Sequence, residues 1–143
     1  MITHEYTFRV NYSDTDKMGV VHHSNYARYC ENARWELFRK IGIPYDDIEE
    51  MGYMLPVFLM NSSFIAPAHY DDELRIVTVL EECKGVRITF TFRLFNEKNI
   101  PVNETEIVLA CVDKDTFKPC PIPPFITEGV ESYLFRQTIE DTY

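Results

Sequence analysis

The spacing of hydrophobic residues changes along the first part of this chain from a strand period to a helix period. Over Glu5–Tyr12, apolar and polar residues alternate, which is typical of a half-buried strand. From Ser24 the apolar residues recur at intervals of three and four, which predicts a helix of about five turns that stops before Gly42. Ser24 or Asn25 is placed to cap its first turn. The residues of this stripe are Tyr26, Tyr29, Cys30, Ala33, Leu37 and Ile41.

Four further strands are predicted after a short acidic segment, Tyr45–Met51, which itself favours a second helical turn. The polar loop Asn96–Asn99, between two of these strands, predicts a hairpin. Pro56 marks an edge or a bulge, because proline has no N–H for a strand ladder. The final ~20 residues, which follow a proline-rich run, are expected to form a loose helix or tail. The four strands are Met54–Ala66, Leu74–Glu81, Val86–Phe95 and Thr105–Asp113.

The order of these elements, one strand, one long helix and four strands in a meander, predicts the α+β class. A five-stranded antiparallel sheet must cover its apolar face, and the predicted helix is the only long element available. The simplest arrangement is a sheet wrapped round one long central helix, in a single domain that spans residues 1–143. Such a helix leaves the sheet edges uncovered, and Trp35 lies outside the apolar stripe. We therefore expect a subunit contact and a homo-oligomer, either a homodimer or a homotetramer.

Composition and charge exclude several classes of function. The 143 residues include 14 Lys and Arg against 23 Asp and Glu, for a formal net charge of -9. A surface this negative repels nucleic acid and anionic membranes. No stretch reaches the ~18 apolar residues of a membrane span, and the first residues lack the basic and apolar runs of a signal peptide. The four cysteines form no Cys-x-x-Cys pair, so we expect free thiols in a reducing cytoplasm.

Between Tyr12 and His23 the chain gathers a phenol, two carboxylates and two imidazoles just before the predicted helix. Free N–H groups at a helix start can bind a developing oxyanion, and a carboxylate beside them can attack a carbonyl or activate water. The same residues also have a structural interpretation, since Ser13–Asp16 is an ordinary turn sequence and Tyr12 can belong to the core. His22 and His23 are neighbours without a third ligand, so we expect no metal and no cofactor.

This segment resembles the signature of the 4-hydroxybenzoyl-CoA thioesterase family of hotdog proteins, and within that family it is most similar to the Tol-Pal-associated acyl-CoA thioesterases. The resemblance extends from about Thr3 to Pro121 and includes two supporting stretches, Leu55–Val57 and Pro67–Leu74. It implies the hotdog fold, assembled as dimers or pairs of dimers with sites at the subunit interface. The motif that carries it is Asp14-Thr15-Asp16-x-x-Gly19-Val20-Val21-x-His23-x-x-Tyr26.

By position in that motif, the resemblance implies catalytic roles for three residues. Asp16 matches the family's essential carboxylate, a nucleophile or a general base. His23 stands where the helix begins, and its backbone N–H would polarise the thioester carbonyl. Tyr12 matches a site tyrosine of the Tol-Pal-associated group, four residues before the aspartate. Lys17–Met18 departs from the small residues common in the family, which changes the expected shape of the pocket.

The resemblance also implies a set of substrate-binding residues. Three of them belong to the loop motif, and two cations flank a later turn that relatives use near the pantetheine and phosphates. Because CoA is anionic, the site must gather cations against the overall charge, although each of these side chains also fits a solvated surface. The set is Gly19, Val21, Tyr26, Lys84 and Arg87, with Lys98 and Lys114 as further cations.

The expected function is therefore that of a cytoplasmic hydrolase, an acyl-CoA thioesterase that releases a carboxylic acid and CoA with Asp16 as nucleophile or general base. One alternative is a thioesterase for acyl carrier protein, but that acidic partner suits a chain of charge -9 poorly. A second is a non-catalytic acyl-binding module, which would gain nothing from a carboxylate beside a helix start. A hotdog hydratase would need an Asp and a His arranged on the long helix, and that arrangement is not found in this sequence.

Overall fold

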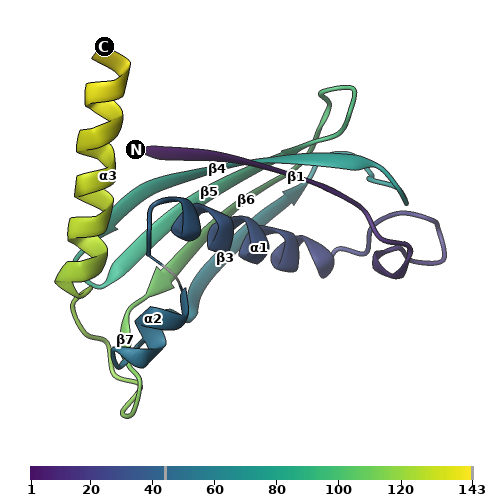
Figure 1. The fold of residues 1–143 in the computed structure, drawn as a ribbon. Helices are drawn as coiled ribbons and strands as arrows, with labels where there is room; N and C mark the ends of the chain where they lie inside the picture. Colours follow the sequence, from purple (N-terminus) through teal and green to yellow (C-terminus); the bar gives the residue numbers. More distant parts are fainter. Residues whose placement is uncertain (44, 143) are drawn as a thin grey trace.

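A computed structural model describes residues 1–43 and 45–142 of the chain. Its main feature is a five-stranded antiparallel sheet, with helix α1 across one face and helix α3 at one end (Figure 1). In chain order the elements are β1 (Ile2–Arg9), a 3-10 turn η1 (Tyr12–Asp14), α1 (Asn25–Lys40), α2 (Tyr45–Glu50), β2 (Tyr53–Met54), β3 (Val57–Phe64), β4 (Glu73–Lys84), β5 (Arg87–Phe95), β6 (Pro101–Ala110), β7 (Val112–Asp113) and α3 (Pro124–Thr142).

The strands of the sheet lie in the order β1-β4-β5-β6-β3, and each neighbouring pair is antiparallel. The predicted five-stranded antiparallel sheet is confirmed, but the predicted meander of the last four strands is wrong. Short turns join β4 to β5 and β5 to β6, whereas the connection at residues 65–72 carries the chain from β3 at one edge to β4 on the far side. Strands β1 and β3 are therefore the two edges of the sheet.

Helix α1 supplies one side of the hydrophobic core. All six residues of the apolar stripe in the sequence are buried, and they share one cluster with the inward side chains of the strands. Phe38, on the same helix, packs edge-on against Phe90 of β5, with ring centroids 5.8 Å apart. Periods of about 3.6 and 2 residues thus place the apolar faces of α1 and the sheet against each other. The predicted helix is confirmed to within one residue at each end.

The expectation that α1 is the only long helix is wrong. Helix α3 covers 19 residues against the 16 of α1, and only Ile126 and Val130 of α3 are buried. Because so few apolar residues of α3 face the core, the sequence carries little helical periodicity there and indicated only a loose helix or tail. No helix in the described part of the chain is both long and apolar enough to span a membrane.

Two local expectations need correction. The first strand spans Ile2–Arg9 and not Glu5–Tyr12, since its ladder ends where its partner β4 begins at Glu73. Tyr12 lies in the following turn with 77% of its surface exposed, so a role in core packing is wrong. Trp35 is half-buried against Tyr45 of α2, with ring centroids 6.0 Å apart. The contact that the sequence assigned to another subunit is thus made at least partly within the chain.

Candidate active site

The loop before α1 and the connection after β3 together line a hollow of about 340 Å³, which we call the Asp16 hollow. The two segments are joined through their backbones, because Val21 N–H donates to the Ala68 carbonyl at 2.8 Å. From the loop and α1 the lining residues are Asp16, Met18, Val20, Val21, His23 and Tyr26. From β3 and the connection they are Phe64, Ile65, Ala66 and Pro67.

Asp16 is half-buried at the rim of this hollow and shapes its own loop. Its Oδ1 accepts hydrogen bonds from the N–H groups of Met18 (2.8 Å) and Val20 (3.4 Å). Gly19 closes the turn with a φ of 80°, a conformation that glycine adopts without strain. The Oδ2 atom of Asp16 has no donor among the described residues. One carboxylate oxygen therefore fixes the loop while the other can reach a ligand.

The start of α1 is not capped in the predicted way. Ser24 makes no capping bond to the helix, and instead its hydroxyl (2.8 Å) and its N–H (3.3 Å) bond to Nδ1 of His22. Within residues 1–43 and 45–142, the backbone N–H of His23 has no acceptor, although the N–H of His22 donates to the Asp14 carbonyl. The imidazole of His23 is exposed and lies edge-on to Phe64. An unpaired N–H and a half-paired carboxylate thus belong to the same hollow.

The inner wall of the hollow is apolar and aromatic. Tyr26 is only 3% exposed and packs edge-on against Phe64, with ring centroids 5.6 Å apart. Burial, with a further contribution from Asp72, raises the pKa of Tyr26 to about 12, so this phenol stays protonated near neutral pH. Val21 is buried beside it. The sequence reasoning missed Phe64 and the residues after it as site residues. The available signal was the supporting stretch that begins at Pro67.

Four of the predicted site residues do not line the hollow. Gly19 closes the turn of the loop but is not part of the wall. Tyr12 points to solvent, where its ring lies edge-on to Tyr70. Lys84 and Arg87 flank the β4–β5 turn, at the end of the sheet near α3 (Figure 1). Strand β4 has 12 residues, so at about 3.3 Å per residue Lys84 lies roughly 36 Å from the β4 end that adjoins the hollow. Arg87 instead stacks over the ring of Phe58 at 4.6 Å.

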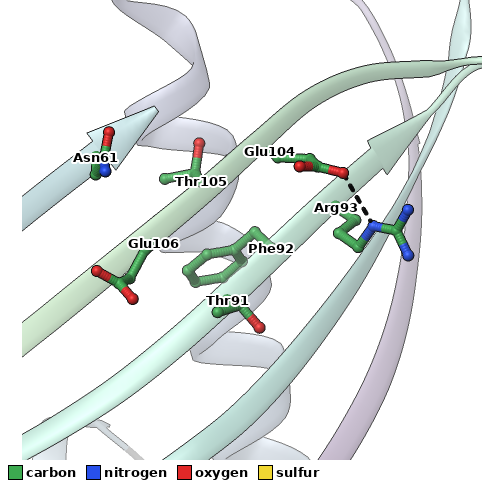
Figure 2. A pocket seen from close by; sticks show the side chains of 7 residues that line it. All are labelled: Asn61, Thr91, Phe92, Arg93, Glu104, Thr105 and Glu106. Carbon is green, nitrogen blue, oxygen red and sulfur yellow. Dashed lines mark hydrogen bonds and ion pairs between the residues drawn. The ribbon is translucent and has the colours of Figure 1, made fainter. Parts of the chain in front are cut away.

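A second hollow, of about 350 Å³, lies on the sheet face that α1 does not cover, and we call it the outer-face hollow. Figure 2 shows its side chains, which come from Asn61 on β3, Thr91–Arg93 on β5 and Glu104–Glu106 on β6. The dashed line in Figure 2 joins Arg93 Nε to Glu104 Oε1 at 3.3 Å. Strands β5 and β6 below it pair on both sides, so their N–H groups are used in the sheet ladder.

Comparison with known proteins gives a consistent result. The model of the thioesterase-like superfamily matches residues 10–130. The acyl-CoA thioester hydrolase YbgC of Escherichia coli is 36% identical over 118 residues, which cover 82% of this chain and 88% of that protein. The acyl-CoA thioesterase YbgC of Helicobacter pylori is 32% identical over 131 residues, covering 84% and 94%. The solved DHNA-CoA thioesterase of Staphylococcus aureus is 30% identical and covers 99% and 95%, with a TM-score of 0.87.

Proposed function

The chain belongs to the thioesterase-like superfamily of hotdog proteins, and we propose that it is an acyl-CoA thioesterase that converts acyl-CoA and water into a carboxylic acid and CoA. The observation that carries this proposal is the pairing of two groups in one hollow. Asp16 has a carboxylate oxygen without a donor, and His23 has a backbone N–H without an acceptor among the described residues. The relatives named acyl-CoA thioesterases support the reaction class.

Two routes are open to the Asp16 carboxylate. As a nucleophile it attacks the thioester carbon, CoA leaves as the thiolate and takes up a proton, and water then cleaves the mixed anhydride. As a general base it removes a proton from water as the water attacks the same carbon, after which the C–S bond breaks and CoA leaves as the thiolate and takes up that proton. General-base catalysis contributes about 10² to 10⁴ in rate. In both routes negative charge develops on the carbonyl oxygen, and the His23 N–H is the donor we assign to it.

The apolar wall of the hollow suits the acyl part of the substrate. Tyr26, Val21 and Phe64 offer aromatic and aliphatic surface with no charged group except Asp16 at the rim. Gly19 lets the loop bend beside the reacting carbon, and Met18 reaches the hollow with 79% of its surface exposed. We assign these residues to acyl binding. We assign no role in acyl binding to the side chain of Tyr12, because it lies outside the hollow.

The positions of Lys84 and Arg87 are explained if two copies pair through β3. On the side away from β6, this edge strand has no partner among the described residues, and its exposed apolar residues would be covered by a second copy. An antiparallel pair related by a two-fold axis places the Val57 end of one β3 beside the Phe64 end of the other. Arg87 stacks over Phe58 near the first end, and the Asp16 hollow adjoins the second. We therefore propose a homodimer, or a homotetramer of two such dimers, in which cations from one subunit bind the CoA phosphates of the other.

Subunit complementation tests this arrangement. We expect Asp16→Asn and Arg87→Ala homodimers each to have low kcat/KM for acyl-CoA. Random exchange makes half of the dimers mixed, and each mixed dimer regains one intact site out of two, so the mixture recovers about a quarter of the wild-type sites. Recovery of none, with exchange verified by mass, would place both residues in a site within one chain. Light scattering that shows only a 16.9 kDa monomer would reject the dimer itself.

The loop motif from Asp14 to Tyr26 supports a narrower family assignment. We propose that the chain is a member of the 4-hydroxybenzoyl-CoA thioesterase family and, within it, of the Tol-Pal-associated group. We also propose that α1 is the central helix of one hotdog domain that spans residues 1–143. A cytoplasmic location suits the thiols, because Cys111 and Cys120 are free, with their sulfurs 3.7 Å apart in a thiol hydrogen bond and not in a disulfide.

A substrate panel tests the proposed activity. The wild-type chain is offered acyl-CoA thioesters of several chain lengths and aromatic types, together with the same acyl groups on acyl carrier protein, and free thiol is measured. We expect turnover on the CoA thioesters. Turnover only on the carrier-bound acyl groups would favour a carrier-protein thioesterase, and binding without release of any thiol would favour an acyl-binding module.

A further inference from the structure

The carboxylate of Asp14, unlike that of Asp16, is enclosed by protein. Asp14 is 5% exposed, its Oδ1 forms an ion pair with Arg28, and its Oδ2 accepts a hydrogen bond from the Tyr29 hydroxyl at 2.8 Å. A buried carboxylate is costly unless its oxygens are paired in this way. Both donors come from the first turns of α1, so they hold the turn before the loop against the helix after it.

The main chain of Asp14 carries this constraint to the start of the helix. Its carbonyl oxygen accepts two hydrogen bonds at 2.9 Å, one from the His22 N–H and one from the Asn25 side-chain amide. The His22 N–H is therefore fixed by Asp14, and the next N–H along the chain is that of His23, which has no acceptor in the described residues. The place of the His23 N–H beside the Asp16 hollow depends on where Asp14 is held.

The Tyr29 hydroxyl is suited to act as a permanent donor. Its ring is buried between Phe8 and Tyr26, with centroids 4.5 and 5.8 Å away. Burial and the hydrogen bond to Asp14 raise the pKa of Tyr29 well above its ordinary value, so the proton stays in place across the working range of an enzyme. The side chain of Arg28 is 47% exposed, so the outer side of the ion pair is open to solvent.

We propose that Tyr29 and Arg28 are positioning residues, which act through Asp14 to hold the His23 N–H where the thioester oxygen becomes negative. This inference rests on the proposed thioesterase function and deepens it. Neither side chain lines the Asp16 hollow, so neither contacts the thioester group we place there. Their effect should therefore appear in the rate of the chemical step and not in substrate binding, because the donor is needed most in the transition state.

The first test is Tyr29→Phe, which removes one hydroxyl and keeps the ring. We expect kcat for acyl-CoA to fall about 10-fold with little change in KM, since a small displacement of a catalytic donor costs up to ~100-fold in rate. Tyr133→Phe, on α3, is the matched control and should change neither constant. An unchanged kcat in Tyr29→Phe, or a fall explained by loss of folded protein, would overturn the proposal.

The second test uses chemical rescue of the ion pair. Arg28→Ala should lower kcat, and millimolar guanidinium should restore part of it, because the Arg28 side chain reaches Asp14 from the solvent side. Arg39→Ala removes another exposed arginine of α1 that forms an ion pair with Glu36, and guanidinium should have no effect on it. Guanidinium that raises the melting temperature of Arg28→Ala without raising kcat would show a purely structural role.

A third measurement separates this inference from the proposed function. The ¹⁵N–¹H resonance of the His23 amide can be followed without any substrate. Tyr29→Phe should shift it while leaving the amides of β5 in place. A wild-type chain that cleaves no thioester would reject the function and leave this measurement valid. An active wild type whose His23 amide does not move in Tyr29→Phe would reject the positioning role alone.

Discussion

The two hollows have nearly the same volume, about 340 and 350 Å³, and yet their walls differ in chemistry. The outer-face hollow lies mainly over β5 and β6, which pair on both sides, and Arg93 already pairs with Glu104 there. The Asp16 hollow lies where a loop meets a helix start and the backbone is not paired in a ladder. There a backbone N–H without an acceptor and a carboxylate oxygen without a donor, both counted among the described residues, line the same hollow. The Glu106 carboxylate of the outer-face hollow also has no donor among the described residues, but the N–H groups of its strand are used in the sheet ladder.

This difference shows that the size of a hollow does not mark an active site. A catalytic group must bind something that is absent from the resting protein, so some of its hydrogen-bonding capacity must remain unused. Sheet ladders consume backbone donors, whereas loops and helix ends leave them free. The comparison therefore predicts that replacing a carboxylate by its amide lowers kcat in the Asp16 hollow and leaves kcat unchanged in the outer-face hollow.

The largest expected effect separates Asp16 from Glu106. Asp16→Asn is nearly isosteric and keeps an acceptor for the loop N–H groups, but it removes the reacting carboxylate. We expect kcat to fall by ~100-fold or more with little change in melting temperature. Glu106→Gln makes the same change in the outer-face hollow and should leave kcat unaltered. Steady-state thiol release measures both variants.

Asp14→Asn provides a control within the loop itself. It weakens a buried ion pair, so it should lower the melting temperature as well as kcat, whereas Asp16→Asn should lower kcat alone. If Asp14→Asn were inactive at full stability and Asp16→Asn active, the assignment of the reacting carboxylate would be wrong. Equal loss in Asp16→Asn and Glu106→Gln would instead remove the distinction between the hollows.

The local parts of the fold were predictable from the sequence. The α1 stripe and the alternation in β5 follow from the geometry of single elements, and the structure confirms them. The partner of β3 was not predictable, because its pairing with β6 depends on a connection that crosses the sheet. Helix α3 was poorly indicated, since most of its surface meets solvent and carries no apolar period.

The candidate site likewise contains residues that a local motif predicted and residues that long-range contacts bring in. Residues from Asp16 to Tyr26 are close in sequence, and one motif pointed to all of those that line the hollow from this side, apart from Met18. Phe64 and Pro67 were missed because backbone contacts, such as the bridge from Val20 to His69, bring their segment to the loop. Such long-range contacts leave no local pattern. The separation of Lys84 and Arg87 from the hollow has the same origin, because position along a strand does not reveal which end of the sheet carries the site.

A smaller effect distinguishes the two histidines beside the Asp16 hollow. His23→Ala removes an imidazole that lines the hollow but keeps the backbone N–H, so we expect kcat to fall about 10-fold, less than for loss of a general base. His22→Ala removes a ring that bonds to Ser24 and does not line the hollow, and it should change kcat much less. Equal effects in the steady-state assay would mean that the register of the helix start is assigned wrongly.

The smallest expected effect is that of removing metal ions. The proposed reaction needs only the Asp16 carboxylate and backbone donors, so exhaustive chelation should leave thiol release unchanged. The strongest challenge to this expectation comes from the outer-face hollow, where Glu104 and Glu106 project from the same face of β6. Two carboxylates, one of them paired with Arg93, fall short of the six to eight oxygen ligands that Ca²⁺ takes, and Mg²⁺ needs near-octahedral oxygen geometry. Complete loss of activity on chelation, restored by one divalent ion, would contradict the carboxylate mechanism. If Glu106→Gln then prevented that restoration, the outer-face hollow would be the metal site, and the contrast between the two hollows would have to be abandoned.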